Sequence, residues 1–115
     1  MKDSKQFSQI LLYLPPTDMR KQVAGLAVMV ESVLKENPFD RSLFIFCNKR
    51  RDIIKAIYFD RAGFCLWMKK LDKERFPWVR HGNGSYKMDA KDLDLLLDGV
   101  DVFGRHKTLN FESMD

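Results

Sequence analysis

The residues with the chemistry to bind a polyanion are concentrated in the middle of this 115-residue chain. Residues 41–81 carry eleven basic and four acidic side chains, whereas residues 1–40 carry five of each and residues 82–104 carry two basic and five acidic ones. Lysine and arginine can neutralise phosphates, so this block predicts a surface for nucleic acid. The candidate nucleic-acid-binding residues are Arg20, Lys21, Lys49, Arg50, Arg51, Lys55, Arg61, Lys69, Lys70 and Arg75.

The same cations have an alternative role, because lysines and arginines also solvate the outer face of a sheet. That alternative is weakest for Lys49, Arg50 and Arg51, since three adjacent cations repel one another and contribute little to folding. Trp67 and Trp78 are interleaved with the basic residues. They are candidate partner-binding residues, although tryptophan in a small protein usually contributes core area first.

The sequence contains little that predicts catalysis or metal binding. Cys47 and Cys65 stand at no recognisable ligand spacing from His81 and His106, so we expect two free buried thiols and no metal site. A Cys–His nucleophile pair is equally unsupported.

Acidic residues offer one catalytic alternative, a two-metal nuclease site built from Asp18, Asp52 and Asp60. Each of them has a simpler role in a helix start, beside cations or in a turn. The cluster Asp89, Asp92, Asp94 and Asp98 lacks the spacing and central glycine of a calcium loop, and no glycine-rich phosphate loop is present. We therefore expect no catalytic residues, no cofactor and no enzymatic activity.

The length and composition predict one globular domain. We expect a flexible N-terminus over residues 1–9, a single domain over 10–103 and a polar tail over 104–115. No apolar run approaches the roughly 20 residues that a membrane helix needs, and two cysteines are too few for a secreted disulfide scaffold. The expected compartment is the cytoplasm, without membrane contact.

The elements that must position the basic residues follow from periodicity. Thr17 is the expected N-cap of an amphipathic helix that runs to about Lys35, and Asn37 and Pro38 stop it. Its apolar stripe comprises Met19, Val23, Leu26, Ala27, Val30, Val33 and Leu34.

The middle of the chain changes to a strand pattern. Runs 43–47, 53–59 and 64–69 are short and rich in aromatic and β-branched residues, and a glycine-containing turn joins the second run to the third. Residues 71–88 look irregular. A second helix follows, with Asp89 as N-cap and Gly99 as stop. The expected fold class is therefore α+β: an N-terminal amphipathic helix packed on a three-stranded antiparallel meander, with a second short C-terminal helix.

A series of ordered matches over about residues 12 to 102 resembles the TnpB-type accessory proteins of the insertion-sequence-66 family of bacterial transposons. The matching segments are Thr17 to Lys21, Gly25-Leu26, Asn37 to Phe39, Leu43 to Phe46, Asn48 to Asp52, Ile54-Lys55, Tyr58 to Asp60, Gly63 to Trp67, Lys70-Leu71, Arg75 to Trp78 and Leu96 to Asp101. Gln22 stands where the family often has glycine. Tyr58-Phe59 stands where a tryptophan is common.

The resemblance implies a role in DNA transposition beside a separate transposase that carries the catalytic triad. Two functions of different class follow as expectations. The first is a non-catalytic factor that binds transposon DNA through the basic central sheet and loop. The second is a protein–protein adaptor for the transposase or another protein of the element, without direct DNA contact. A divergent nuclease is the third alternative.

Overall fold

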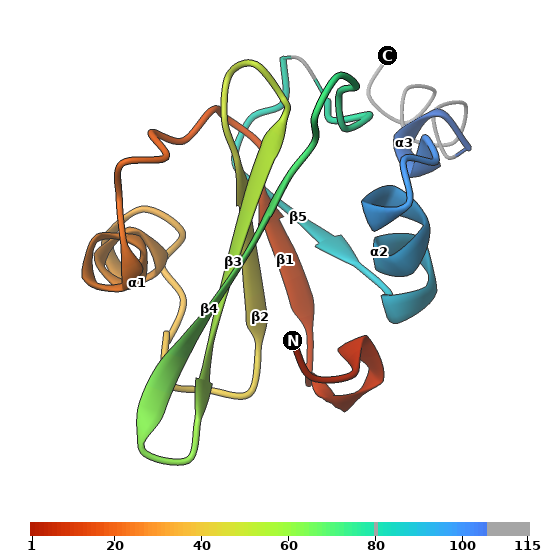
Figure 1. Ribbon diagram of the computed structural model, residues 1–115. Coiled ribbons are helices and arrows are strands. Elements are labelled where there is room, and N and C mark those ends of the chain that lie inside the picture. Colours follow the sequence, from red (N-terminus) through yellow and green to blue (C-terminus); the bar gives the residue numbers. More distant parts are fainter. Residues whose placement is uncertain (80, 106–115) are drawn as a thin grey trace.

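The computed structural model describes residues 1–79 and 81–105 (Figure 1), so Arg80, His106 and the rest of the tail lie outside the described residues. Within this part, five strands form one mixed sheet in the order β4-β3-β2-β1-β5. The strands are β1 (Ile10–Tyr13), β2 (Leu43–Cys47), β3 (Ile53–Asp60), β4 (Gly63–Lys70) and β5 (Ser85–Met88). The helices are the 3-10 turn η1 (Ser4–Gln6), α1 (Val23–Ser32), α2 (Ala90–Leu97) and α3 (Val102–Arg105).

The expected architecture of one helix on a three-stranded antiparallel meander is wrong. The meander exists as β2, β3 and β4, but β1 pairs with β2 in parallel and β5 pairs with β1 in antiparallel, which completes a five-stranded mixed sheet. Residues 85–88, expected to be irregular, form β5. Both added strands are four residues long, and so short a segment becomes a strand through pairing rather than through its own pattern.

The two faces of the sheet bury separate apolar clusters, because alternate residues of a strand point to opposite faces. Leu11, Phe44 and Phe46 lie on the face that α1 covers with Leu26 and Val30. The opposite face is covered by α2 and α3, so the molecule has three layers (Figure 1). Its core residues on the strands are Ile10, Leu12, Leu43, Ile45, Cys47, Ile54, Ala56, Tyr58 and Met88.

Helix α1 begins later than the sequence pattern indicates. Thr17 is buried, its backbone N–H donates to the Cys47 oxygen at 2.8 Å, and Gln22 occupies the N-cap position without a capping hydrogen bond from its side chain. This hydrogen bond joins the segment after β1 to the end of β2, and its two residues are distant in sequence. Leu26 and Val30 are the fully buried members of the predicted stripe, whereas Val33 is 49% exposed.

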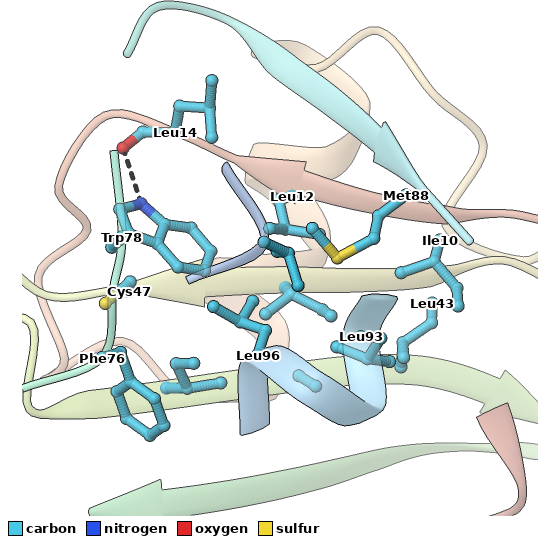
Figure 2. Close-up of a cluster of buried hydrophobic side chains, with 14 of the residues drawn as sticks. Ile10, Leu12, Leu14, Leu43, Cys47, Phe76, Trp78, Met88, Leu93 and Leu96 are labelled. Carbon is cyan, nitrogen blue, oxygen red and sulfur yellow. Dashed lines mark hydrogen bonds between the residues drawn. The ribbon is translucent and has the colours of Figure 1, made fainter. Parts of the chain in front are cut away.

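Helix α2 follows the prediction closely. The Asp89 carboxylate accepts from the Asp92 backbone N–H at 2.7 Å, and Gly99 adopts φ 88° just beyond the helix. Leu93 and Leu96 are fully buried against the sheet (Figure 2), whereas Val100 is 40% exposed.

The residues before β1 also pack on this layer. Ser4 in η1 donates its hydroxyl to the Asp94 carboxylate at 3.1 Å, and Phe7 packs edge-on against Tyr58. The domain boundaries stay predictions. Across the described residues, none of the helices combines the length and the apolar character that a membrane crossing requires.

Candidate nucleic-acid interface

The loop between β2 and β3 carries the three adjacent cations and is held by one asparagine. The Asn48 side-chain oxygen accepts from the backbone N–H groups of Asp52 and Ile53, both at 3.0 Å. Its amide nitrogen donates to the Asp52 carboxylate at 2.7 Å. Arg51 adopts the left-handed backbone conformation with φ 62°. The loop is therefore a fixed turn that presents Lys49 and Arg50 to solvent.

The only acidic residue of this loop is Asp52, which is largely buried and hydrogen-bonded to Asn48 within the loop. The hydrogen bond from the Asn48 amide lowers the pKa of the Asp52 carboxyl below its ordinary value, with weaker help from the charges of Arg50 and Arg75. The Arg50 guanidinium is 3.8 Å from the Asp52 carboxylate and its side chain is 73% exposed, so the contact is loose. Arg50 remains accessible to an anion.

The segment that follows β4 is attached to this loop through the backbone. The Phe76 N–H donates to the Arg51 oxygen at 2.6 Å, and the Leu71 N–H donates to the Asp52 oxygen at 2.8 Å. Phe76 itself is fully buried. Arg75, which immediately precedes it, is exposed beside the cationic loop.

The same segment is also attached to the end of β1. The Trp78 indole N–H donates to the Leu14 oxygen at 3.0 Å (Figure 2), and the Leu14 N–H donates to the Gly84 oxygen at 2.9 Å. A Cβ placed on Gly82 would lie 2.6 Å from the Leu14 Cβ, so the backbone passes β1 at a distance that only glycine allows. Residues 76–79 and 81–84 thus lie over the end of β1.

The segments joined by these contacts line an open cleft of about 430 Å³, called here the basic cleft. Its cationic residues are Lys49, Arg50, Arg51 and Arg75. Its apolar wall consists of Leu14, Pro16, Trp78 and Val79, and Asn48 and His81 complete it. No acidic residue lines the cleft among the described residues, so it carries a concentrated positive charge.

The position of the cleft follows from the parallel pairing of β1 and β2. Parallel strands end at the same edge of a sheet, and ligands of open α/β sheets bind outside such carboxyl ends. Leu14 and Pro16 follow β1 directly, and Asn48 follows β2. Five lining residues were not among the predicted site residues, because no local pattern shows which loops meet at this edge: Leu14, Pro16, Asn48, Val79 and His81.

Two of the predicted nucleic-acid-binding lysines have structural contacts. Lys55 is only 4% exposed, and its ammonium donates to the backbone oxygens of Met19 and Lys21, each at 2.8 Å. The Lys69 ammonium donates to the Leu97 oxygen at the end of α2, at 2.8 Å. Neither lines the basic cleft.

The other predicted cations outside the cleft are exposed but dispersed. Arg20 forms a paired contact with Asp18, at 2.6 Å for the shortest distance, and its hydrogen bonds hold the pKa of the Asp18 carboxyl at about 2. Lys21 precedes α1, and Lys70 ends β4. Arg61 occupies the β3–β4 turn at the far end of the eight-residue strand β3, about 25 Å from the cationic loop.

The two tryptophans differ in accessibility. Trp78 is 5% exposed and hydrogen-bonded, so it forms part of the wall of the cleft. Trp67 is half-buried opposite Ala56 and packs against the cluster beneath α2. In the described chain, neither ring projects freely into solvent.

The residues considered for catalysis are separated. Asp52 and Asp60 stand at opposite ends of β3, and Asp18 is paired with Arg20. Cys47 is free and buried, which raises the pKa of its thiol to about 12, and Cys65 is free and half-buried. In residues 1–79 and 81–105, no three histidine, cysteine, aspartate or glutamate side chains are grouped closely enough to hold a metal ion.

Fold and cleft together define a small protein with a five-stranded mixed sheet between helices and a basic cleft at one edge of that sheet. Comparison with known families gives a match to the family described as IS66 Orf2 like protein, over residues 8–107. This chain belongs to that family and is a transposition accessory protein of an insertion sequence. Membership of this family associates the chain with the transposition machinery that such elements encode.

Two curated proteins of Sinorhizobium fredii are similar to this chain. The uncharacterized protein y4hO is 40% identical over 85 residues, which is 74% of each chain. The uncharacterized protein y4jC is 31% identical over 93 residues, which is 81% of this chain and 80% of that protein. No solved structure matches the chain.

Proposed function

We propose that this accessory protein binds the DNA of its element through the basic cleft and does not itself catalyse strand cleavage. The observation that carries the proposal is the 2.6 Å hydrogen bond from the Phe76 N–H to the Arg51 oxygen. It joins the loop with Lys49, Arg50 and Arg51 to the segment with Arg75. Four cations from two distant parts of the chain therefore act at one place on a phosphate backbone.

The hydrogen bonds of Asn48 and of the Phe76 backbone hold the cationic loop in one conformation. Because Asn48 and Phe76 fix the loop, little conformational freedom is lost on binding.

Salt dependence tests the proposal. The purified protein is titrated against a labelled duplex carrying the terminal sequence of the element, at salt concentrations between about 50 and 200 mM. A variant with Lys49→Gln, Arg50→Gln and Arg51→Gln should bind more weakly and lower the slope of log affinity against log salt by about three.

A matched control removes the same charge elsewhere. Lys35, Arg41 and Arg61 are exposed and lie outside the cleft. Their triple glutamine variant should retain most of the affinity and of the salt slope. Equal losses in the two variants, or no DNA binding by the wild-type protein, would contradict the proposal.

The non-catalytic part of the proposal has its own experiment. Labelled terminal DNA incubated with the protein and Mg²⁺ or Mn²⁺ should stay intact, because Asp18, Asp52 and Asp60 lie apart. Reproducible cleavage that Asp52→Ala or Asp60→Ala abolishes would establish a nuclease instead.

A second candidate function, adaptor for the transposase, is favoured by an exposed aromatic cluster at the opposite edge of the sheet. The rings of Phe39, Phe59 and Phe64 pack with centroids 5.2 to 5.3 Å apart, and Phe39 is 58% exposed. Exposed aromatic side chains are frequent anchors of protein interfaces. Phe39→Ser should reduce co-purification with the transposase, whereas Val28→Ser, at an isolated residue that is 60% exposed, should not. Undiminished capture by the Phe39 variant would argue against this surface.

A further inference from the structure

We infer that the basic cleft takes one unpaired nucleotide at a DNA end, with its phosphate on the cations and its base against the apolar wall; this rests on the proposed DNA binding. The cleft thereby distinguishes between forms of DNA. Its lining is divided into a charged side and an apolar side.

The charged side fits phosphate. Lys49 and Arg50 are exposed, Arg51 is half-buried, and Arg75 faces the same space from the other wall. The side chain of Asn48 is fully engaged within the loop, because its oxygen accepts two backbone N–H groups and its nitrogen donates to Asp52. The polar groups left to a ligand are therefore cationic donors, apart from His81.

The apolar side of the cleft offers no group that could bind a charged phosphate. On this wall Pro16 is exposed and Val79 is half-buried, whereas Leu14 and Trp78 are almost fully buried. The indole is fixed by its hydrogen bond to the Leu14 oxygen, and Gly82 packs directly against the Leu14 side chain. These contacts hold the apolar wall in place, where it can contact the face of a base.

The size of the cleft selects unpaired bases. A volume of about 430 Å³ falls within the range of small-molecule sites, about 300–1,000 Å³. Bases of a duplex are stacked and paired, and withdrawing one costs a few kcal/mol, whereas an unpaired terminal nucleotide enters without that cost. A duplex alone would reach only the cations at the rim.

The experiment compares three labelled DNAs of equal phosphate number by fluorescence anisotropy: a blunt duplex, a duplex with a short 3′ overhang and a duplex with a short 5′ overhang. We expect at least one overhang to bind about fivefold or more tightly than the blunt duplex, which is the lower end of what one base contact contributes. Val79→Gln, which replaces apolar wall by an uncharged polar side chain, should remove the preference while blunt-duplex affinity stays within about twofold. Val28→Gln, on the exposed side of α1, is the matched control and should keep the preference.

A second readout locates the nucleotide. The chain has two tryptophans, so Trp67→Phe leaves Trp78 as the only indole emitter. Overhang DNA should quench or shift Trp78 emission, and blunt duplex should do so much less. Thermal unfolding of each variant confirms that the fold is retained.

The outcomes separate the two proposals. Salt-dependent binding that the Lys49, Arg50 and Arg51 variant weakens, but without preference for an overhang, overturns this inference and leaves the proposed function standing. An overhang preference that survives Val79→Gln and leaves Trp78 emission unchanged also overturns it, because the nucleotide then binds elsewhere. Absence of binding to all three DNAs overturns both proposals.

Discussion

The buried Lys55 ammonium donates a hydrogen bond of 2.8 Å to the backbone oxygen of Met19. A second bond of equal length reaches the Lys21 oxygen. Together they attach residues 19–21, which connect β1 to α1, to the middle of the sheet. A residue that the sequence assigns to DNA binding thereby fixes the approach to the first helix.

This relationship predicts a loss of stability when Lys55 is truncated. Lys55→Ala removes two hydrogen bonds from a charged donor and the packing of a buried side chain, and we expect a cost of about 2–4 kcal/mol in the free energy of unfolding. Urea denaturation measures it. Lys70→Ala, at an exposed lysine at the end of β4, should change stability by no more than about 0.5 kcal/mol. A Lys55 variant of unchanged stability but weakened DNA binding would restore the role of a DNA contact.

The loop that carries the cations predicts a pH dependence. The pKa of Asp52 is lowered in the folded protein, chiefly by the Asn48 amide, so its stabilising contribution is present above the unfolded value of about 3.9. It is lost as the pH falls through the lower folded value. The unfolding free energy of the wild-type protein should therefore fall more steeply below about pH 4 than that of Asp52→Asn, whose amide oxygen can still accept from Asn48. Parallel pH profiles for the two proteins would contradict this.

The close passage at Gly82 predicts opposite effects of two glycine substitutions. Gly82→Ala places a Cβ 2.6 Å from the Leu14 Cβ, and relieving this overlap should cost about 1–3 kcal/mol and disturb the wall of the cleft. Gly63→Ala meets nothing within 4 Å and should be neutral or slightly stabilising. Thermal unfolding of the two variants is the measurement. Equal melting temperatures would show that the segment yields easily.

The two cysteines predict selective alkylation. Burial raises the pKa of Cys47 to about 12, so its thiol stays protonated at pH 8, whereas Cys65 is partly exposed. Iodoacetamide should modify Cys65 first in the folded protein and both cysteines in urea, as peptide mass spectrometry would show. Cys65→Ser should leave the folded protein nearly unlabelled. Rapid labelling of Cys47 would mean that the end of β2 opens readily.

Much of the secondary structure could be predicted because its signals are local. The aromatic and β-branched runs gave β2, β3 and β4 to within one residue, and Asp89 gave the start of α2. The start of α1 could not be found in this way, because Thr17 and Asp18 have the chemistry of helix caps, but the Thr17 backbone is bonded to Cys47 and the Asp18 carboxylate to Arg20. Strand β5 has no pattern of its own and depends on pairing with β1.

The residues of the candidate site were likewise predictable only where their signal is local. The sequence by itself determined that Lys49, Arg50 and Arg51 would be adjacent in a loop after a strand, and that the chain resembles transposition accessory proteins. Only the tertiary structure decided that Arg75, Pro16 and Val79 meet that loop, and that Lys55 and Trp78 are buried. The physical reason is that the cleft is built by parallel pairing of β1 with β2 and by backbone hydrogen bonds between distant segments. Backbone N–H and C=O groups occur in nearly every residue, so the side chains do not reveal which of these groups will be bonded to each other.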